Sequence, residues 1–135
     1  MYPLRLLAIL ASALLSACAS HQNAPQQTAT SPETDFSTRT DITFSPDGWS
    51  RTLQADLYLP ETGDLLPAVL LVHGGGWERR SREDMAWIAE HLASRGFAVM
   101  NIDYRFAPEH TFPAQLYDLQ VAMKWLYHHA DARRA

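Results

Sequence analysis

The sequence has little of what several common classes of protein require. A single cysteine, Cys18, occurs among the 135 residues, so no disulfide can form within the chain. Only 19% of the residues are charged, the formal net charge is −4 and there is no basic stripe, which argues against nucleic-acid binding. No lysine follows the glycine-rich segment as it does in phosphate-binding loops, so Walker-type nucleotide binding is disfavoured.

Long apolar runs are also missing. The run at residues 6–15 is shorter than the roughly 20 residues that span a bilayer and is typical of a secretory signal. Residues 15–18, Leu-Ser-Ala-Cys, resemble the lipobox of bacterial lipoproteins, in which the signal is cut before the cysteine and the cysteine is acylated. We therefore expect residues 1–17 to be a signal peptide and Cys18 to carry the lipid that anchors an exported cell-envelope protein to a membrane. Cleavage after Ala19 fits the same stretch and would give a periplasmic or secreted protein.

The next segment changes in composition. Residues 18–38 are rich in glutamine, threonine, serine, alanine and proline and have no apolar periodicity, which predicts a disordered tether. From residue 39 onward apolar residues recur with regular periods, in keeping with an overall hydrophobic content of 47%. We assign residues 39–135 to one partial α/β domain.

Four strands are predicted in this domain. Alternating segments at 40–44 and 53–59 are expected to pair as an antiparallel hairpin. The apolar run at 68–72 predicts a strand buried on both faces. A second buried strand is predicted at 97–102 and is expected to lie parallel to the first, because a helix crosses over between them.

Two helices complete the predicted order. The first follows a Ser-x-x-Asp start signature at Ser81, and it ends at Gly96. Its apolar stripe is formed by Met85, Ile88, Ala89 and Leu92. The second begins at Pro113, and its inner face is expected to carry Leu116, Leu119, Met123 and Leu126.

The strand at 68–72 opens into the stretch His73-Gly74-Gly75-Gly76-Trp77. Ligands of α/β folds bind at the carboxyl ends of the strands, and glycines allow the backbone to approach a ligand closely. The backbone N–H groups of such a loop suit a developing oxyanion during acyl transfer. The alternative is that the glycines only make a tight strand-to-helix turn.

Three blocks together resemble the α/β-hydrolase superfamily, most closely the hormone-sensitive-lipase-like esterases and the related acetyl and feruloyl esterases. The blocks are His73 to Trp77, then Gly96 to Val99 running to Asp103-Tyr104-Arg105, then Ala107-Pro108-Glu109-His110 with Phe112-Pro113-Ala114 and Asp118. The resemblance covers about residues 40–135. It implies the N-terminal portion of an α/β-hydrolase sheet, an antiparallel β-hairpin followed by β-α-β-α, which is incomplete.

The resemblance also implies roles for the loop. Gly75 and Gly76 would donate the oxyanion-hole N–H groups, and Gly74 would shape the turn. Gly74 and Trp77 are the candidate substrate-binding residues, although a plain packing role fits Trp77 as well. A small-molecule or polysaccharide ester is the implied substrate, and neither a metal nor an organic cofactor is implied.

Polar residues around the loop are given structural roles. His73 is expected only to shape the loop, because the catalytic histidine of the family lies near the C-terminus. Asp103, Arg105 and Glu109 are expected to form a polar network that braces the loop below the site.

Other charged and titratable residues are expected at the surface. Arg79, Arg80 and Arg82 either favour anionic substrates or line a solvated helix entrance. His128 and His129 are adjacent, so they diverge on a helix and cannot easily share a metal. We expect both histidines to be exposed near the end of the second helix.

The catalytic triad of the family has no counterpart in these residues. No G-x-S-x-G occurs, and the last serine is Ser94. We expect a fragment of a serine carboxylester hydrolase that is inactive alone, poorly stable and prone to associate through an open sheet edge. Two alternatives are an arylformamidase- or amidase-type acyl hydrolase, and a non-catalytic envelope lipoprotein with a decayed hydrolase domain.

Overall fold

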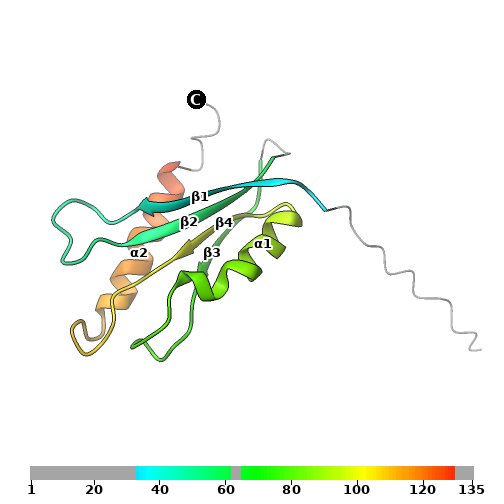
Figure 1. Cartoon of the computed structure of the whole chain (residues 1–135). Helices are drawn as coiled ribbons and strands as arrows, with labels where there is room; N and C mark the ends of the chain where they lie inside the picture. The colour runs from blue at the N-terminus through cyan, green and yellow to red at the C-terminus, as the bar shows by residue number, and fades with distance from the viewer. Residues whose placement is uncertain (1–32, 62–64, 130–135) are drawn as a thin grey trace, which may run out of the picture. The chain divides into compact units, whose positions relative to one another are not determined.

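The computed structural model describes residues 33–61 and 65–129, which form a four-stranded mixed sheet with helices packed against it (Figure 1). The elements in chain order are β1 (Phe36–Thr43), β2 (Gln54–Pro60), β3 (Ala68–Val72), the 3-10 turn η1 (Arg82–Met85), α1 (Ala86–Ser94), β4 (Ala98–Ile102) and α2 (Ala114–His129). The predicted signal peptide, Cys18 and most of the predicted tether lie outside the described residues. No helix in the described ranges is long and apolar enough to cross a membrane.

The strand order in the sheet is β1-β2-β4-β3. β1 pairs antiparallel with β2, and β2 pairs antiparallel with β4. β3 and β4 run parallel, with Ala68 opposite Ala98, so the expected hairpin and the expected parallel crossover are both confirmed. β1 begins earlier than expected: residues 36–38, assigned to the tether, are strand because they pair with β2.

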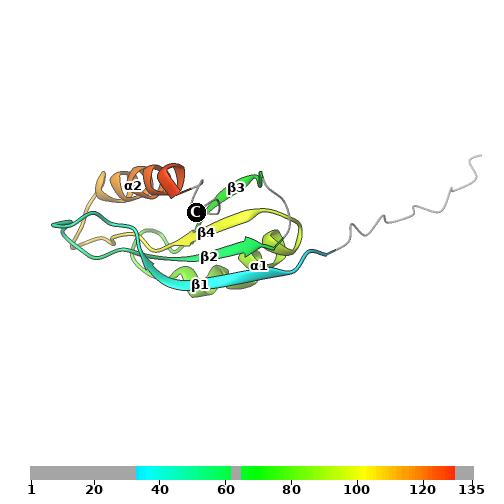
Figure 2. The ribbon, with the colours of Figure 1, turned by 90° about the horizontal axis from the view of Figure 1, so that it is seen from above.

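The two faces of the sheet are covered by different helices (Figure 2). Side chains alternate across each strand, so every second apolar residue reaches the same face. One cluster packs against Ala122 of α2, and it contains Ala55, Leu57, Met100 and Ile102. The other packs against Ala89 and Ala93 of α1, and it contains Tyr58 and Val99.

The expectation that β3 is buried on both faces is wrong for the described residues. Ala68 is exposed and the other four residues of β3 are only half-buried, whereas β4 is buried from Val99 to Ile102. The cause is position, because β3 is the last strand of the described sheet and β4 has a strand on each side. An uncharged apolar strand therefore lies at an edge.

The first helix begins and ends at the expected signals. The backbone N–H of Ser81 donates to Asp84 Oδ2 at 3.3 Å, and the first turn is 3-10 before the α-helical residues start at Ala86. Gly96 takes a φ of +90°, the left-handed region that favours glycine after a helix, and its N–H donates to Ala93 O. Phe97 then leads the chain into β4.

The predicted inner face of α2 is partly wrong. Leu116 is 46% exposed and Met123 is 54% exposed, so neither belongs to the core. The buried residues of α2 are Gln115, Asp118 and Ala122. The buried face of α2 is the one that carries Asp118, because the carboxylate of Asp118 is fully buried and pairs with the guanidinium of Arg105.

Candidate functional site

The glycine loop lies where β3 ends, beside the carboxyl end of the parallel strand β4 (Figure 1). Gly75 has a φ of +121° and Gly76 a φ of +66°, backbone conformations that residues with a Cβ seldom adopt. A Cβ at Gly75 would lie 2.1 Å from the carbonyl oxygen of Arg79, because the loop folds back on itself. The N–H of Glu78 donates to Gly75 O across this bend at 3.3 Å.

The backbone donors of the loop are free to meet a ligand. Gly74 and Gly76 are exposed and Gly75 is half-buried. Within the described ranges, no oxygen of the protein accepts a hydrogen bond from the N–H of Gly75 or of Gly76. The loop borders a crevice of about 670 Å³, lined by Gly74, Gly75, Gly76, Glu78, Arg79 and Arg80. Two successive N–H groups beside an open crevice can hold a negatively charged oxygen.

His73 forms the base of the loop and is buried, with 3% of its surface exposed. Its Nδ1 lies 2.7 Å from Gly74 O, and since a carbonyl only accepts, Nδ1 carries the proton. The ring stacks on Tyr104 with centroids 4.4 Å apart, and the Tyr104 hydroxyl donates to His73 O at 3.1 Å. Nε2 is also buried, so this imidazole shapes the loop and is not presented to the crevice.

Trp77 ties the glycine loop to the loop that follows β4. The Trp77 carbonyl accepts a hydrogen bond from the N–H of Ala107 at 2.9 Å. The indole stacks on Phe112 with centroids 6.4 Å apart, and more than half of each side chain is exposed. Trp77 holds a positive φ of +66° in this position. The pairing with Phe112 has no signal in the sequence, because 35 positions separate the two rings.

Arg82 holds the other end of the glycine loop, and it is buried, not solvated as one interpretation of the sequence had it. Its guanidinium lies within 4 Å of four carboxylates, of which those of Asp41, Asp56 and Asp103 are close and that of the neighbouring Glu83 is 3.8 Å away. Its backbone N–H donates to Asp103 Oδ1 at 2.9 Å, and its carbonyl accepts from Asn101 Nδ2 at 2.7 Å. Burial alone would lower the pKa of this guanidinium, but the hydrogen bonds to Asp56 and Asp103 outweigh burial and raise the pKa.

The expected network of Asp103, Arg105 and Glu109 does not exist as one unit. Asp103 pairs with Arg82, whereas Arg105 pairs with Asp118 at 2.7 Å. Glu109 is exposed, and its carboxylate lies 3.7 Å from Nε2 of the neighbouring His110. Two separate ion pairs therefore brace the site, one under each loop.

A nucleophile and a base are not paired in the part of the chain that the structure describes. There, no serine hydroxyl donates to a histidine ring, and no group of His, Cys, Asp and Glu side chains could hold a metal ion. His128 and His129 are exposed as expected, and His129 stacks on Trp125 at 4.0 Å. The described residues therefore place two unengaged N–H groups beside a crevice, without a paired nucleophile and base.

Comparison with known proteins places most of the described residues in a family of known sequences. The BD-FAE family model matches residues 55–134. Carboxylesterase NlhH of Mycobacterium tuberculosis is 37% identical over 68 residues, which are 50% of this chain and 21% of that protein. Carboxylic ester hydrolase LipN of the same species is 34% identical over 94 residues, 67% of this chain and 25% of that protein.

Solved structures are similar over a comparable part. The esterase of Pyrobaculum calidifontis superposes with a TM-score of 0.65 at 38% identity, covering 74% of this chain and 32% of that chain. This chain therefore spans about a fifth to a third of the length of these three relatives.

Proposed function

Because the chain belongs to the BD-FAE family, whose fold is α/β-hydrolase-like, we propose that residues 33–129 provide the oxyanion-binding part of a serine carboxylester hydrolase. The observation that carries the proposal is the pair of unengaged N–H groups at Gly75 and Gly76, which border an open crevice. A serine from polypeptide outside these residues would attack the ester carbonyl, with a histidine taking its proton. The carbonyl oxygen would gain negative charge and accept both N–H groups.

The positive φ angles favour this role over a plain turn. One glycine is enough for a strand-to-helix turn, whereas here two successive glycines take a positive φ, and neither donates its N–H to a protein oxygen within the described residues. Gly74 shapes the entry to that bend, and Trp77 follows the glycines with an exposed indole that offers an apolar surface to a substrate. An amide or formamide carbonyl would fit the same two donors, so an arylformamidase or amidase activity is the second candidate within the same chemistry.

A chimera tests the proposal. Residues 55–129 would replace the matching segment of the Pyrobaculum calidifontis esterase, and the rest of that esterase would supply the attacking group that these residues lack. We expect hydrolysis of 4-nitrophenyl butyrate to be retained, and kcat to fall about a hundredfold in a variant with glycolic acid in place of Gly76, because the ester linkage removes one N–H donor and still allows the φ of +66°. An unchanged kcat in that variant would contradict the oxyanion role of the Gly76 N–H. Faster hydrolysis of an N-formyl anilide than of the ester would favour the amidase candidate. The 135-residue chain alone should show no turnover above background.

We also propose an exported, lipid-anchored location, supported by the Leu-Ser-Ala-Cys motif that ends at Cys18. Expression in a bacterial host with radiolabelled palmitate tests it. The wild-type chain should take up label and a Cys18→Ser variant should not. Secretion of an unlabelled wild-type chain would favour cleavage after Ala19.

A further inference from the structure

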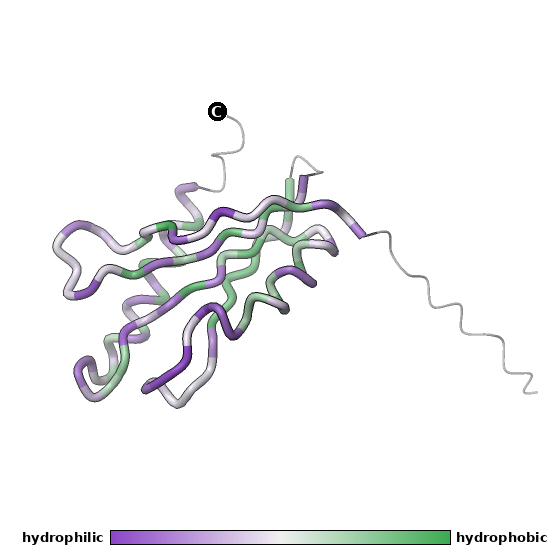
Figure 3. The backbone as a smooth tube through the Cα atoms, in the orientation of Figure 1, coloured by the Kyte–Doolittle hydropathy of each residue, from purple (hydrophilic) through white to green (hydrophobic). Residues whose placement is uncertain are grey.

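Of the three arginines that follow the glycines, Arg79 and Arg80 line the crevice and Arg82 does not. Arg79 and Arg80 line the same crevice as the three glycines, and both side chains are exposed. Within the described residues, no carboxylate forms an ion pair with either guanidinium, whereas Arg82 is surrounded by carboxylates. Figure 3 shows the hydrophilic segment that directly follows the glycines.

The backbone holds Arg79 and Arg80 against Gly75 of the glycine loop. The carbonyl of Arg79 packs on the Cα of Gly75, so closely that no Cβ fits between them. The Cγ of Arg80 lies 3.3 Å from the same Cβ position, which places the stem of that side chain beside Gly75. Arg80 takes a φ of +79°, a conformation that costs about 1 kcal/mol for a residue with a side chain. Strain of this kind gathers at functional sites.

The net charge of the residues that line the crevice favours an anion with a single negative charge. Two guanidiniums and the carboxylate of Glu78 leave the crevice with a formal charge of about +1 (2 − 1), in a chain whose net charge is −4. A dianion such as phosphate would be repelled by Glu78 after the first charge is matched. A single carboxylate is matched, and a guanidinium binds it with two parallel hydrogen bonds.

We infer that Arg79 and Arg80 select esters that carry a carboxylate on the acyl or the alcohol part. The inference rests on the proposed function, because it places the ester carbonyl at Gly75 and Gly76 and the carboxylate at the two arginines. These arginines determine specificity and take no part in bond breaking.

Binding to the 135-residue chain tests the inference without any need for turnover. Monomethyl glutarate, dimethyl glutarate and inorganic phosphate are titrated while the backbone amide signals of residues 74–80 are followed by NMR. Monomethyl glutarate should shift these signals and bind about fivefold more tightly than the neutral diester, as an exposed ion pair allows. The Arg79→Gln/Arg80→Gln double variant should lose this preference, and Glu78→Gln should strengthen it.

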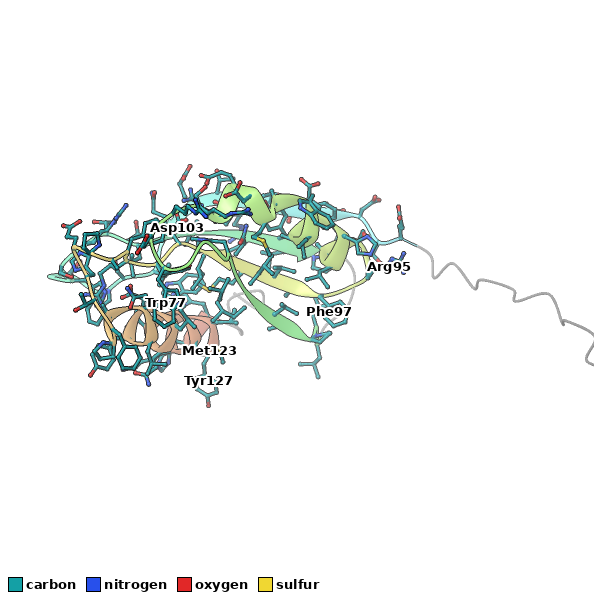
Figure 4. The ribbon with its side chains drawn as sticks, turned by 90° about the horizontal axis from the view of Figure 1, so that it is seen from below. Trp77, Arg95, Phe97, Asp103, Met123 and Tyr127 are labelled. Atoms are coloured by element: carbon teal, nitrogen blue, oxygen red, sulfur yellow. The ribbon has the colours of Figure 1, made fainter. Side chains whose placement is uncertain are left out.

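Arg95→Gln is the matched control, because Arg95 is exposed at the opposite end of the sheet from Trp77 (Figure 4). It should bind as the wild type does. Equal binding of the two glutarates, tighter binding of phosphate, or an unchanged preference in the double variant would each overturn the inference.

The chimera gives a second measurement that does not depend on the stability of the isolated chain. The ratio of kcat/KM for mono-4-nitrophenyl glutarate to that for 4-nitrophenyl butyrate should fall about fivefold in the double variant. A chimera that is active on both esters with a ratio unaffected by the arginines contradicts the inference alone. A chimera inactive on both contradicts the proposed function, and the NMR titration then still decides the anion preference.

Discussion

The carboxylate of Asp118 on α2 and the guanidinium of Arg105 after β4 form a buried ion pair, with Nη2 and Oδ1 2.7 Å apart. Asp118 is fully buried and also accepts hydrogen bonds from the N–H of Arg105 and from Trp49 Nε1. Arg105 in turn donates to Ser50 Oγ and to Ala114 O. This pair joins three segments: the loop between β1 and β2, the loop after β4, and the first turn of α2.

The pair of Asp118 and Arg105 should be needed for the stability of the fold. Asp118→Asn leaves the Arg105 charge buried without a counter-ion, so the free energy of unfolding should fall by about 3–5 kcal/mol. Urea denaturation followed by circular dichroism measures the change. Lys124→Gln, on the exposed side of the same helix, should change stability by less than about 0.5 kcal/mol. A small loss in Asp118→Asn would mean that the network contributes little.

Two glycines of the loop should respond very differently to alanine. Gly75→Ala places a Cβ 2.1 Å from Arg79 O at a φ of +121°, so the loop must rearrange at a cost of about 3 kcal/mol. Gly74→Ala meets no atom within 4 Å and has no positive φ, so it should be nearly neutral. Thermal unfolding of both variants decides the matter, and equal losses would contradict the loop conformation described here.

Arg82 should be needed as an arginine. Arg82→Met leaves the buried carboxylate of Asp56 and the partly exposed carboxylate of Asp103 without their cation, at a cost of about 3–5 kcal/mol. Arg82→Lys restores the charge but not the several simultaneous hydrogen bonds, so we expect only partial rescue. Hydrogen exchange should quicken in residues 74–81 of the lysine variant while β4 stays protected. Unchanged exchange in the loop would show that Arg82 does not hold it.

Stability should fall at alkaline pH in part through Tyr104. Burial raises the pKa of this phenol above its ordinary value of 10.0. A raised pKa means that the native state keeps the proton longer, so its stabilisation is complete below about pH 10 and is lost as pH rises through the folded-state pKa. Tyr104→Phe should cost about 1 kcal/mol at pH 7, by removing the hydrogen bond to His73 O, yet decline less steeply above pH 10.

Some loss of stability at alkaline pH should remain in Tyr104→Phe, because burial also raises the pKa of Tyr58. Urea denaturation at a series of pH values measures both slopes. Parallel slopes in the wild type and in Tyr104→Phe would contradict the assignment.

Association should depend on the outer side of α2. Met123 and Tyr127 are exposed apolar residues of this helix and are labelled in Figure 4. Met123→Lys should lower the concentration-dependent association of the chain, because exposed apolar patches drive such contacts. Sedimentation velocity measures it. Trp87→Lys is the matched control on α1, which covers the other face of the sheet. An equal effect of both substitutions would show that association is non-specific and does not depend on α2.

The sequence by itself determined the order of strands and helices, because period-two and period-3.6 patterns, Gly96 and Pro113 act locally. It also determined the glycine loop and the esterase resemblance, since His73 to Trp77 are contiguous. Only the tertiary structure decided which face of α2 is buried. Asp118 is buried because it pairs with Arg105, and this orientation of the helix leaves Leu116 and Met123 exposed. Likewise, it separated Arg82 from Arg79 and Arg80, since the carboxylates that surround Arg82 come from β1, β2 and the end of β4, and no local pattern brings such distant residues together.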